Sequence, residues 1–212
     1  MKCILAGSSG FVGHELLEQC LKNPSVTSIV ALSRRELPPH DKLQVVIVED
    51  FSSYPDTAKE AVKDADACIW TIGLTPTKVP DEETARRVSI GYTTTAAKLF
   101  NENCRKPFRF VYCSGAGAEQ DQTKPLWFMQ DYRRIRGQVE SEILKFANEN
   151  AGFESYIVKP GLIFSRGVPL PSFVSNIATS IKVDNLAAKM LDLALKGGEK
   201  KVWENSEVNS GL

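Results

Sequence analysis

The chain has 212 residues, of which 42% are hydrophobic and 25% charged, the usual balance of a globular domain with one sizeable core. Lysine plus arginine equals aspartate plus glutamate at 26 each, and this zero net charge argues against bulk nucleic-acid binding, which needs a positive surface. A signal peptide and an apolar run of about 18 residues are both missing, so we expect no membrane span and a cytoplasmic location.

Short apolar runs alternate with helical patterns along the chain. The apolar runs predict strands at residues 2–6, 28–32, 43–48, 67–72, 108–113, 153–158 and 201–204. The helical patterns predict helices at residues 11–21, 55–63, 81–101, 131–148 and 184–195. Continuous apolar strands that alternate with helices are typical of a parallel sheet covered on both faces. We therefore predict an α/β fold, a Rossmann-type doubly wound parallel sheet in three α/β/α layers. It forms one domain over residues 1–212, with a short substrate-side region around 162–182.

A glycine-rich turn joins the first predicted strand to the first predicted helix. Its residues are Gly7, Ser8, Ser9, Gly10, Phe11, Val12 and Gly13. A turn in this place gathers free backbone N–H groups at the positive end of a helix, where a pyrophosphate can bind. The glycines permit the tight turn, the approach of phosphate and the packing of helix on strand. The turn therefore predicts a dinucleotide site, and the alternative is a glycine turn that merely suits the fold.

The residues that end the second predicted strand indicate which dinucleotide binds. An acid at this point bonds the ribose 2′-hydroxyl, whereas an arginine accepts a 2′-phosphate. Here Ser33, Arg34 and Arg35 come before the first acid, Glu36. Guanidinium groups match the geometry of a phosphate, so we expect NADP(H). The alternative is that both arginines only solvate a loop.

Two further segments end strands at the same edge of the predicted sheet. Asp50 and Phe51 follow the third strand and are candidates to flank the adenine. The end of the fourth strand supplies Thr71, Ile72 and Gly73, whose backbone is expected to line the cofactor.

No metal site is expected from the sequence. The two histidines, His14 and His40, are too few and too far apart for a zinc site. The cysteines are odd in number and form no CxxC pair, so we interpret them as reduced core thiols.

The motifs together resemble the short-chain dehydrogenase/reductase superfamily. The chain looks most similar to an atypical branch with small NAD(P)-binding proteins such as the Tat-interacting-protein oxidoreductases. The matching features span nearly the whole chain: residues 7–13, 33–35, Ser114, Tyr132, residues 159–161 and the segment 203–205.

The resemblance implies a catalytic set that this sequence alters. Family enzymes pair a tyrosine that moves a proton with a lysine four residues later, and a serine holds the substrate carbonyl. Here the tyrosine is Tyr132, but Arg136 stands at the lysine position and keeps only its charge. The serine is assigned to Ser114, with the Gly115 position as the alternative. A packing role for Tyr132 and an ion pair between Arg136 and Glu140 are the structural alternatives.

The segment after the sixth predicted strand completes the expected site. Lys159, Pro160 and Gly161 are expected under the nicotinamide, with a plain strand-ending turn as the alternative. By family analogy, the long helices at 81–101 and 131–148 form the contact of a homodimer.

Three functions are compatible with these features. The first is an NADPH-dependent reductase of a small carbonyl, imine or enone substrate, with Tyr132 as the proton donor. The second is an NADPH-binding regulator or partner-binding protein without turnover, which the missing lysine motivates. The third is a non-redox isomerase or epimerase, because the fold by itself does not decide the reaction.

Overall fold

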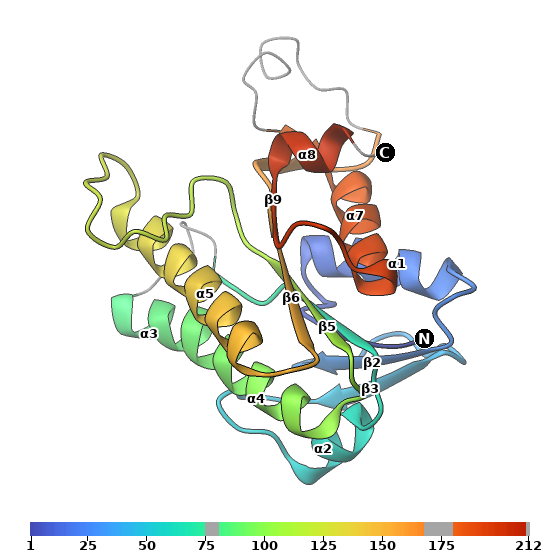
Figure 1. Cartoon of the computed structure of the whole chain (residues 1–212). Coiled ribbons are helices and arrows are strands. Elements are labelled where there is room, and N and C mark those ends of the chain that lie inside the picture. Colours follow the sequence, from blue (N-terminus) through green and yellow to red (C-terminus); the bar gives the residue numbers. More distant parts are fainter. Residues whose placement is uncertain (75–80, 168–179, 211–212) are drawn as a thin grey trace.

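The computed structural model describes residues 1–74, 81–167 and 180–210, and its centre is a seven-stranded sheet (Figure 1). The strand order is β3-β2-β1-β4-β5-β6-β9, and every neighbouring pair is parallel. The strands are β1 (Lys2–Ala6), β2 (Ser28–Ser33), β3 (Leu43–Ile47), β4 (Ala67–Trp70), β5 (Phe108–Cys113), β6 (Phe153–Lys159) and β9 (Val202–Glu204). This topology confirms the predicted doubly wound α/β fold.

Helices cover both faces of the sheet, as Figure 1 shows. One face carries α2 (Asp56–Val62), α3 (Glu82–Arg86), α4 (Tyr92–Asn103) and α5 (Gln130–Glu149), and the other carries α1 (Phe11–Lys22) and α7 (Val183–Lys196). Neighbouring residues of a strand point to opposite faces, so Ile4 joins the core under α2, α4 and α5 while Leu5 joins the core under α1 and α7. Burial on both faces explains why the strands are continuous apolar runs.

The helix predicted over residues 81–101 is interrupted. A π-helical turn, η2 (Arg87–Gly91), lies between α3 and α4, and Thr93 Oγ1 donates to the Ser89 carbonyl at 2.6 Å. The chain stays helical through this wider turn, and Ser89 within the turn and Thr93 after it are both buried.

The chain after β6 contains elements that the sequence did not predict. Strands β7 (Leu162–Phe164) and β8 (Ser180–Lys182) form a separate parallel pair, and helix α8 (Asn205–Ser210) follows β9. Three-residue strands are too short to show a period, so pattern analysis misses them. Residues 168–179 of the expected substrate-side region 162–182 lie outside the described residues.

The strand order fixes where a ligand can bind. Strand β1 pairs with β2 on one side and β4 on the other, so the order reverses there. Ligands of open parallel sheets bind outside the carboxyl ends of the strands at such a reversal. The turn at residues 7–13 follows β1 and residues 71–73 follow β4, which places both at this point.

Replacing Gly13 by alanine tests the close packing of α1 on the turn before it. A Cβ on Gly13 would lie 2.1 Å from the Gly7 carbonyl oxygen, a backbone atom that cannot rotate away. We expect the free energy of unfolding to fall by about 3 kcal/mol, measured by urea denaturation. The control is Gly91→Ala, because the nearest atom to its added Cβ is Arg87 Cγ at 4.0 Å. An equal loss in the control would contradict the packing argument.

Candidate active site

The glycine-rich turn is held by close contacts at all three of its glycines. Gly7 has a φ of +92°, a backbone conformation that residues with a side chain rarely adopt. A Cβ there would also lie 2.4 Å from Thr71 Oγ1, so both the backbone conformation and the space exclude a side chain. The Gly10 N–H donates to the Gly7 carbonyl at 2.9 Å. Together with Gly13, these contacts bring β1, the end of β4 and helix α1 to one point.

The same turn has the features of an anion site. Helix α1 has no side-chain cap at Gly10 and no acid in its first turn, so its first N–H groups and positive end are available. Ser8 is almost fully buried, and its Oγ has no hydrogen-bond partner among the described residues. Ser9 and Phe11 are exposed beside it, and Val12 is half-buried. An orphaned hydroxyl next to free amides fits the oxygens of a pyrophosphate.

The two arginines after β2 lie beside this turn and point to solvent. Ser33 is buried and its Oγ accepts from the Arg35 N–H at 3.2 Å, which fixes the backbone of the segment. Arg34 and Arg35 are exposed, and neither guanidinium pairs with another described side chain. Their charges are therefore free to meet a phosphate at the edge of the site.

The side chains of Asp50 and Phe51 have different surroundings in the structure. Asp50 is exposed, and the Ser52 N–H together with the Tyr92 phenol holds the pKa of its carboxyl below the ordinary value. The Phe51 ring is buried against Trp70 and Tyr92, with ring centroids 5.8 Å from each. The Phe51 side chain is thus part of the core, and only its backbone is left to face an adenine.

The residues after β4 connect the glycine turn to Arg136 of α5. Thr71 donates to the Ala6 carbonyl through both its N–H and its Oγ1, each at 2.9 Å. Ile72 is half-buried and packs against the core. Gly73 lies under the Arg136 guanidinium, where a Cβ would come within 2.9 Å of Nη2.

Arg136 is buried and forms no ion pair with a described residue. Its Nη1 donates to the Tyr112 hydroxyl at 3.1 Å and the Cys113 carbonyl at 2.9 Å, and its Nη2 to the Leu74 carbonyl at 3.3 Å. Its side chain is 8% exposed, and Nε is buried without a partner in the described part of the chain. A buried cation held only by neutral groups is costly for folding, so its charge is a candidate functional feature.

Tyr132 lies one helical turn before Arg136 on the same face of α5. Arg136 Cζ lies 5.4 Å from the centroid of the Tyr132 ring. A Cβ on Gly115 would lie 3.4 Å from the Tyr132 hydroxyl, so this hydroxyl faces the loop after β5. A cavity of about 110 Å³ adjoins the pair between α3 and α5. Its lining residues are Leu74, Asp81, Glu82, Ala85, Ser89, Asp131, Tyr132, Ile135 and Arg136.

The interpretation of Ser114 as a carbonyl anchor meets a competing contact. Ser114 is buried and its Oγ donates to Glu140 Oε1 at 2.5 Å, so the hydroxyl is already engaged. The position beside the Tyr132 hydroxyl is Gly115, which has no side chain to donate.

The alternative ion pair between Arg136 and Glu140 is wrong. Although the two residues are four positions apart, Arg136 reaches the ends of β4 and β5, whereas Glu140 turns toward Ser114 and Lys159. Buried hydrogen-bond partners thus outweigh a pair worth a few tenths of a kcal/mol on a helix surface.

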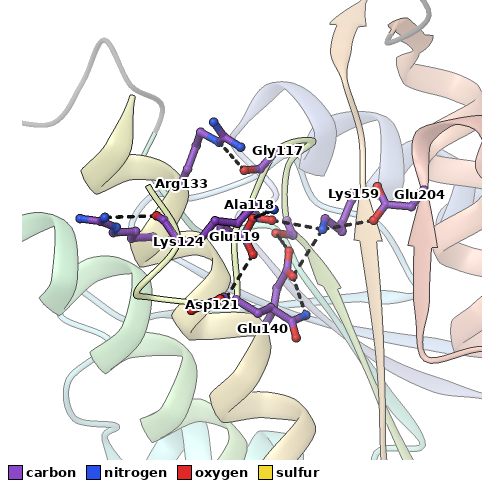
Figure 2. Close-up of polar contacts among 12 residues, drawn as sticks. Gly117, Ala118, Glu119, Asp121, Lys124, Arg133, Glu140, Lys159 and Glu204 are labelled. Atoms are coloured by element: carbon purple, nitrogen blue, oxygen red, sulfur yellow. Dashed lines mark hydrogen bonds and ion pairs between the residues drawn. The ribbon is translucent and has the colours of Figure 1, made fainter. Parts of the chain in front are cut away.

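Lys159 forms ion pairs with the buried Glu140 and the exposed Glu204 (Figure 2). Its Nζ lies 3.7 Å from Glu140 Oε2 and 3.2 Å from Glu204 Oε1, and it donates to the Ala118 carbonyl at 3.3 Å. The two residues after it bond through their backbones, because the Pro160 carbonyl accepts from Ala116 at 2.6 Å and the Gly161 N–H donates to Asn205 Oδ1 at 2.8 Å.

Glu140 is the site residue whose role the sequence did not predict. It also accepts from Gln120 Nε2 at 2.9 Å and is fully buried. Burial raises the pKa of its carboxyl above the ordinary value, although Ser114, Gln120 and Lys159 each act to lower it. One signal was present, because Glu140 is an acid directly after Val139 on the inward side of α5.

The described residues contain neither a candidate metal site nor a candidate membrane-spanning helix. No group of three histidine, cysteine or acidic side chains is arranged to hold a metal within residues 1–74, 81–167 and 180–210. None of the helices in those ranges is long and apolar enough to span a membrane.

The fold and the glycine turn define a dinucleotide-binding Rossmann protein, and a protein-family model agrees. The model is described as NAD(P)H-binding and matches residues 7–167, beginning at the first glycine of the turn. Because the match covers most of the chain, the protein belongs to this NAD(P)H-binding family.

Curated relatives are distant and mostly fungal proteins of the FMP52 type. Mitochondrial protein FMP52 of Candida albicans is 24% identical over 185 residues, which cover 85% of this chain and 75% of the relative. Leucinostatins biosynthesis cluster protein T of Purpureocillium lilacinum is 35% identical over 120 residues. That alignment covers 55% of this chain and 44% of the relative, so the chain spans less than half of it.

Solved structures share the fold at low sequence identity. DesIV, a dTDP-glucose 4,6-dehydratase from Streptomyces venezuelae with bound NAD, has a TM-score of 0.75 at 12% identity, covering 96% of this chain and 75% of its own. The PhqB reductase domain from Penicillium fellutanum has a TM-score of 0.70 at 17% identity, with 96% and 66% covered. These neighbours share the predicted Rossmann-type α/β fold with this chain.

The expected cytoplasmic location is contradicted by the names of the FMP52 relatives. The related proteins from Candida albicans, Debaryomyces hansenii and Aspergillus niger, at 24–26% identity, are all named as mitochondrial. Composition and the lack of an apolar run carry no information on an organelle, which is why the sequence pointed elsewhere.

Replacing Glu140 by glutamine is expected to change how stability depends on pH. The pKa of Glu140 in the native state is raised above its unfolded value of about 4.3. Between the unfolded and the native pKa, the native state therefore binds more protons than the unfolded state does. The wild type therefore loses stability as pH rises through that window, whereas the glutamine variant does not. The destabilisation caused by Glu140→Gln should shrink from about pH 4 toward neutrality, measured by urea unfolding.

The exposed acid Glu149 of the same helix provides the control. Glu149→Gln removes a carboxylate without changing a buried contact. If the loss of unfolding free energy caused by Glu140→Gln grew as the pH rises, the result would contradict a raised pKa of Glu140.

Proposed function

We propose that this protein reduces a small carbonyl, imine or enone compound with NADP(H), and that Tyr132 donates the proton. The observation that carries the proposal is the placement of Tyr132 one turn before Arg136, a buried cation without a described counter-ion. The Tyr132 hydroxyl also faces Gly115 at the carboxyl end of β5, beside the reversal of strand order.

The residues around the strand ends fit a bound dinucleotide. The turn at residues 7–13 would hold the pyrophosphate through its amides and the buried, unpartnered Ser8 hydroxyl. Arg34 and Arg35 would meet the 2′-phosphate of NADP, and the segments 71–73 and 160–161 would flank the nicotinamide side. When bound, NADPH supplies the hydride that reaches the substrate carbon.

The chain's own residues would handle the proton. The Tyr132 hydroxyl hydrogen-bonds the substrate oxygen or nitrogen and gives up its proton as the hydride adds to carbon. The phenolate that remains is stabilised by the Arg136 guanidinium and recovers a proton from water. Gly115 leaves room for the substrate atom beside Tyr132. The adjoining cavity of about 110 Å³ favours a small substrate group.

An NADPH-binding regulator without turnover is the second candidate. It is favoured by one specific arrangement: Ser114 is engaged by Glu140, and the Gly115 position next to Tyr132 has no hydroxyl. Cofactor binding without turnover of any carbonyl compound would favour this candidate over the reductase.

A mitochondrial location is the proposal that the FMP52 relatives support. Fractionation of cells that express the full-length protein tests it, and recovery in the cytosol alone would count against it.

Cofactor choice is the first experiment, because both candidates require it. Calorimetric titration is expected to show tight binding of NADPH and weaker binding of NADH. Arg34→Ala and Arg35→Ala remove charge-assisted bonds to the 2′-phosphate, so each should weaken NADPH binding by about 10- to 100-fold and leave NADH binding unchanged. Arg105→Ala, an exposed arginine paired with Asp66, is the control. Equal loss for both cofactors would contradict a role in the 2′-phosphate site.

Proton donation is tested by Tyr132→Phe on a panel of small carbonyl compounds with NADPH. We expect turnover to fall by at least about 100-fold, because the proton donor is removed, while NADPH affinity stays unchanged. Tyr54→Phe is the matched control, since the Tyr54 hydroxyl is buried without a partner among the described residues. Retained turnover in Tyr132→Phe would refute the assigned role.

A further inference from the structure

Polar side chains from three separate segments meet around the buried carboxylate of Glu140. We call Ser114, Gln120, Glu140 and Lys159 the Glu140 cluster. Glu140 accepts from Ser114 Oγ at 2.5 Å and Gln120 Nε2 at 2.9 Å, and its Oε2 lies 3.7 Å from Lys159 Nζ. These partners come from the end of β5, the loop that follows it, and the end of β6. One carboxylate on α5 therefore ties three segments together.

The loop between β5 and α5 lies against the helix along its whole first part. Arg133 Nε donates to the Gly117 carbonyl at 2.6 Å, and the Glu119 N–H donates to the Arg133 carbonyl at 3.0 Å (Figure 2). Gly137 makes the approach possible, because a Cβ there would lie 1.7 Å from the Glu119 carbonyl oxygen. With Glu140 one turn further on, the helix contacts the loop from residue 133 to residue 140.

The same loop forms a wall of the proposed active site. Its residue Gly115 lies next to the Tyr132 hydroxyl, and Ala116 donates to the Pro160 carbonyl at 2.6 Å. Lys159, directly before Pro160, donates to the Ala118 carbonyl at 3.3 Å. A shift of the loop would therefore change the gap between Gly115 and Tyr132 together with the path of the chain after β6.

We propose that Glu140 and Lys159 are positioning residues that fix the loop 114–120 and thereby set the gap between Gly115 and Tyr132. The inference rests on the proposed function, in which the reacting atom of the substrate occupies this gap. Burying an apolar side chain would cost less free energy than burying a carboxylate. An apolar side chain, however, could not hold the polar groups of three segments in defined positions. The carboxylate accepts hydrogen bonds from Ser114 and Gln120 and forms an ion pair with Lys159, so each segment has one defined place.

The experiment combines hydrogen exchange of the loop amides with steady-state kinetics on the full chain. The reporter amides are those of Ala116, Ala118 and Glu119, which have backbone partners in the structure. In Glu140→Gln and Lys159→Met, we expect their exchange to accelerate by about tenfold or more, the worth of one charged hydrogen bond. We expect kcat to fall by a similar factor, while the KM for NADPH changes by less than about twofold.

Two further variants keep the test decisive. Glu149→Gln removes a carboxylate from the exposed end of α5, where its partner is Lys145 at 4.0 Å, and should change neither readout. Gln120→Ala removes one arm of the cluster from an exposed residue, so it tests the loop even if the buried variants do not fold. It should accelerate loop exchange by a smaller factor than Glu140→Gln does.

The outcomes separate this inference from the proposed function. Unchanged loop exchange in every folded cluster variant would overturn the inference, whatever the kinetics show. Faster exchange with unchanged kcat would overturn the link to Tyr132. A wild type that binds NADPH and reduces no carbonyl compound would refute the proposed function, and loop exchange would then decide by itself whether Glu140 fixes the loop.

Discussion

The parallel sheet is the constraint on which the rest of this structure depends. Because all seven strands of the main sheet run the same way, their carboxyl ends gather at one edge, and each crossover returns over a face. The reversal of order between β1 and β4 opens that edge at the glycine turn. Residues far apart in sequence, such as Gly7, Thr71 and Arg136, thereby come into one chain of contacts.

Helix α5 places two buried charges of opposite sign with different surroundings. Glu140 is matched by donors from three segments, whereas Arg136 is held by two carbonyls and a phenol and has no counter-ion among the described residues. Burying either charge costs stability unless the surroundings compensate it. A carboxylate held by donors from several segments suits a structural task, and a guanidinium without a described counter-ion suits a site where negative charge develops during a reaction.

Membership of the family supports the fold and dinucleotide binding of this chain, but it does not establish the reaction. The chain belongs to an NAD(P)H-binding family, and its structural neighbours include enzymes solved with NAD. Identities of 12–18% to these neighbours transfer the fold and not the reaction. The proposed reaction therefore rests on Tyr132 and Arg136 themselves.

The sequence by itself determined the strands, most helices and the glycine turn, because apolar periodicity and glycine spacing are local signals that burial enforces. It did not determine the π-helical turn, the β7–β8 pair or the partners of the polar residues. Arg136 and Glu140 lie at the spacing of a helical ion pair, yet each turns to backbone and side chains from other strands. Only the tertiary structure decided this, because the best partner of a buried charge is set by which segments the sheet brings beside it, and not by its neighbours along the helix.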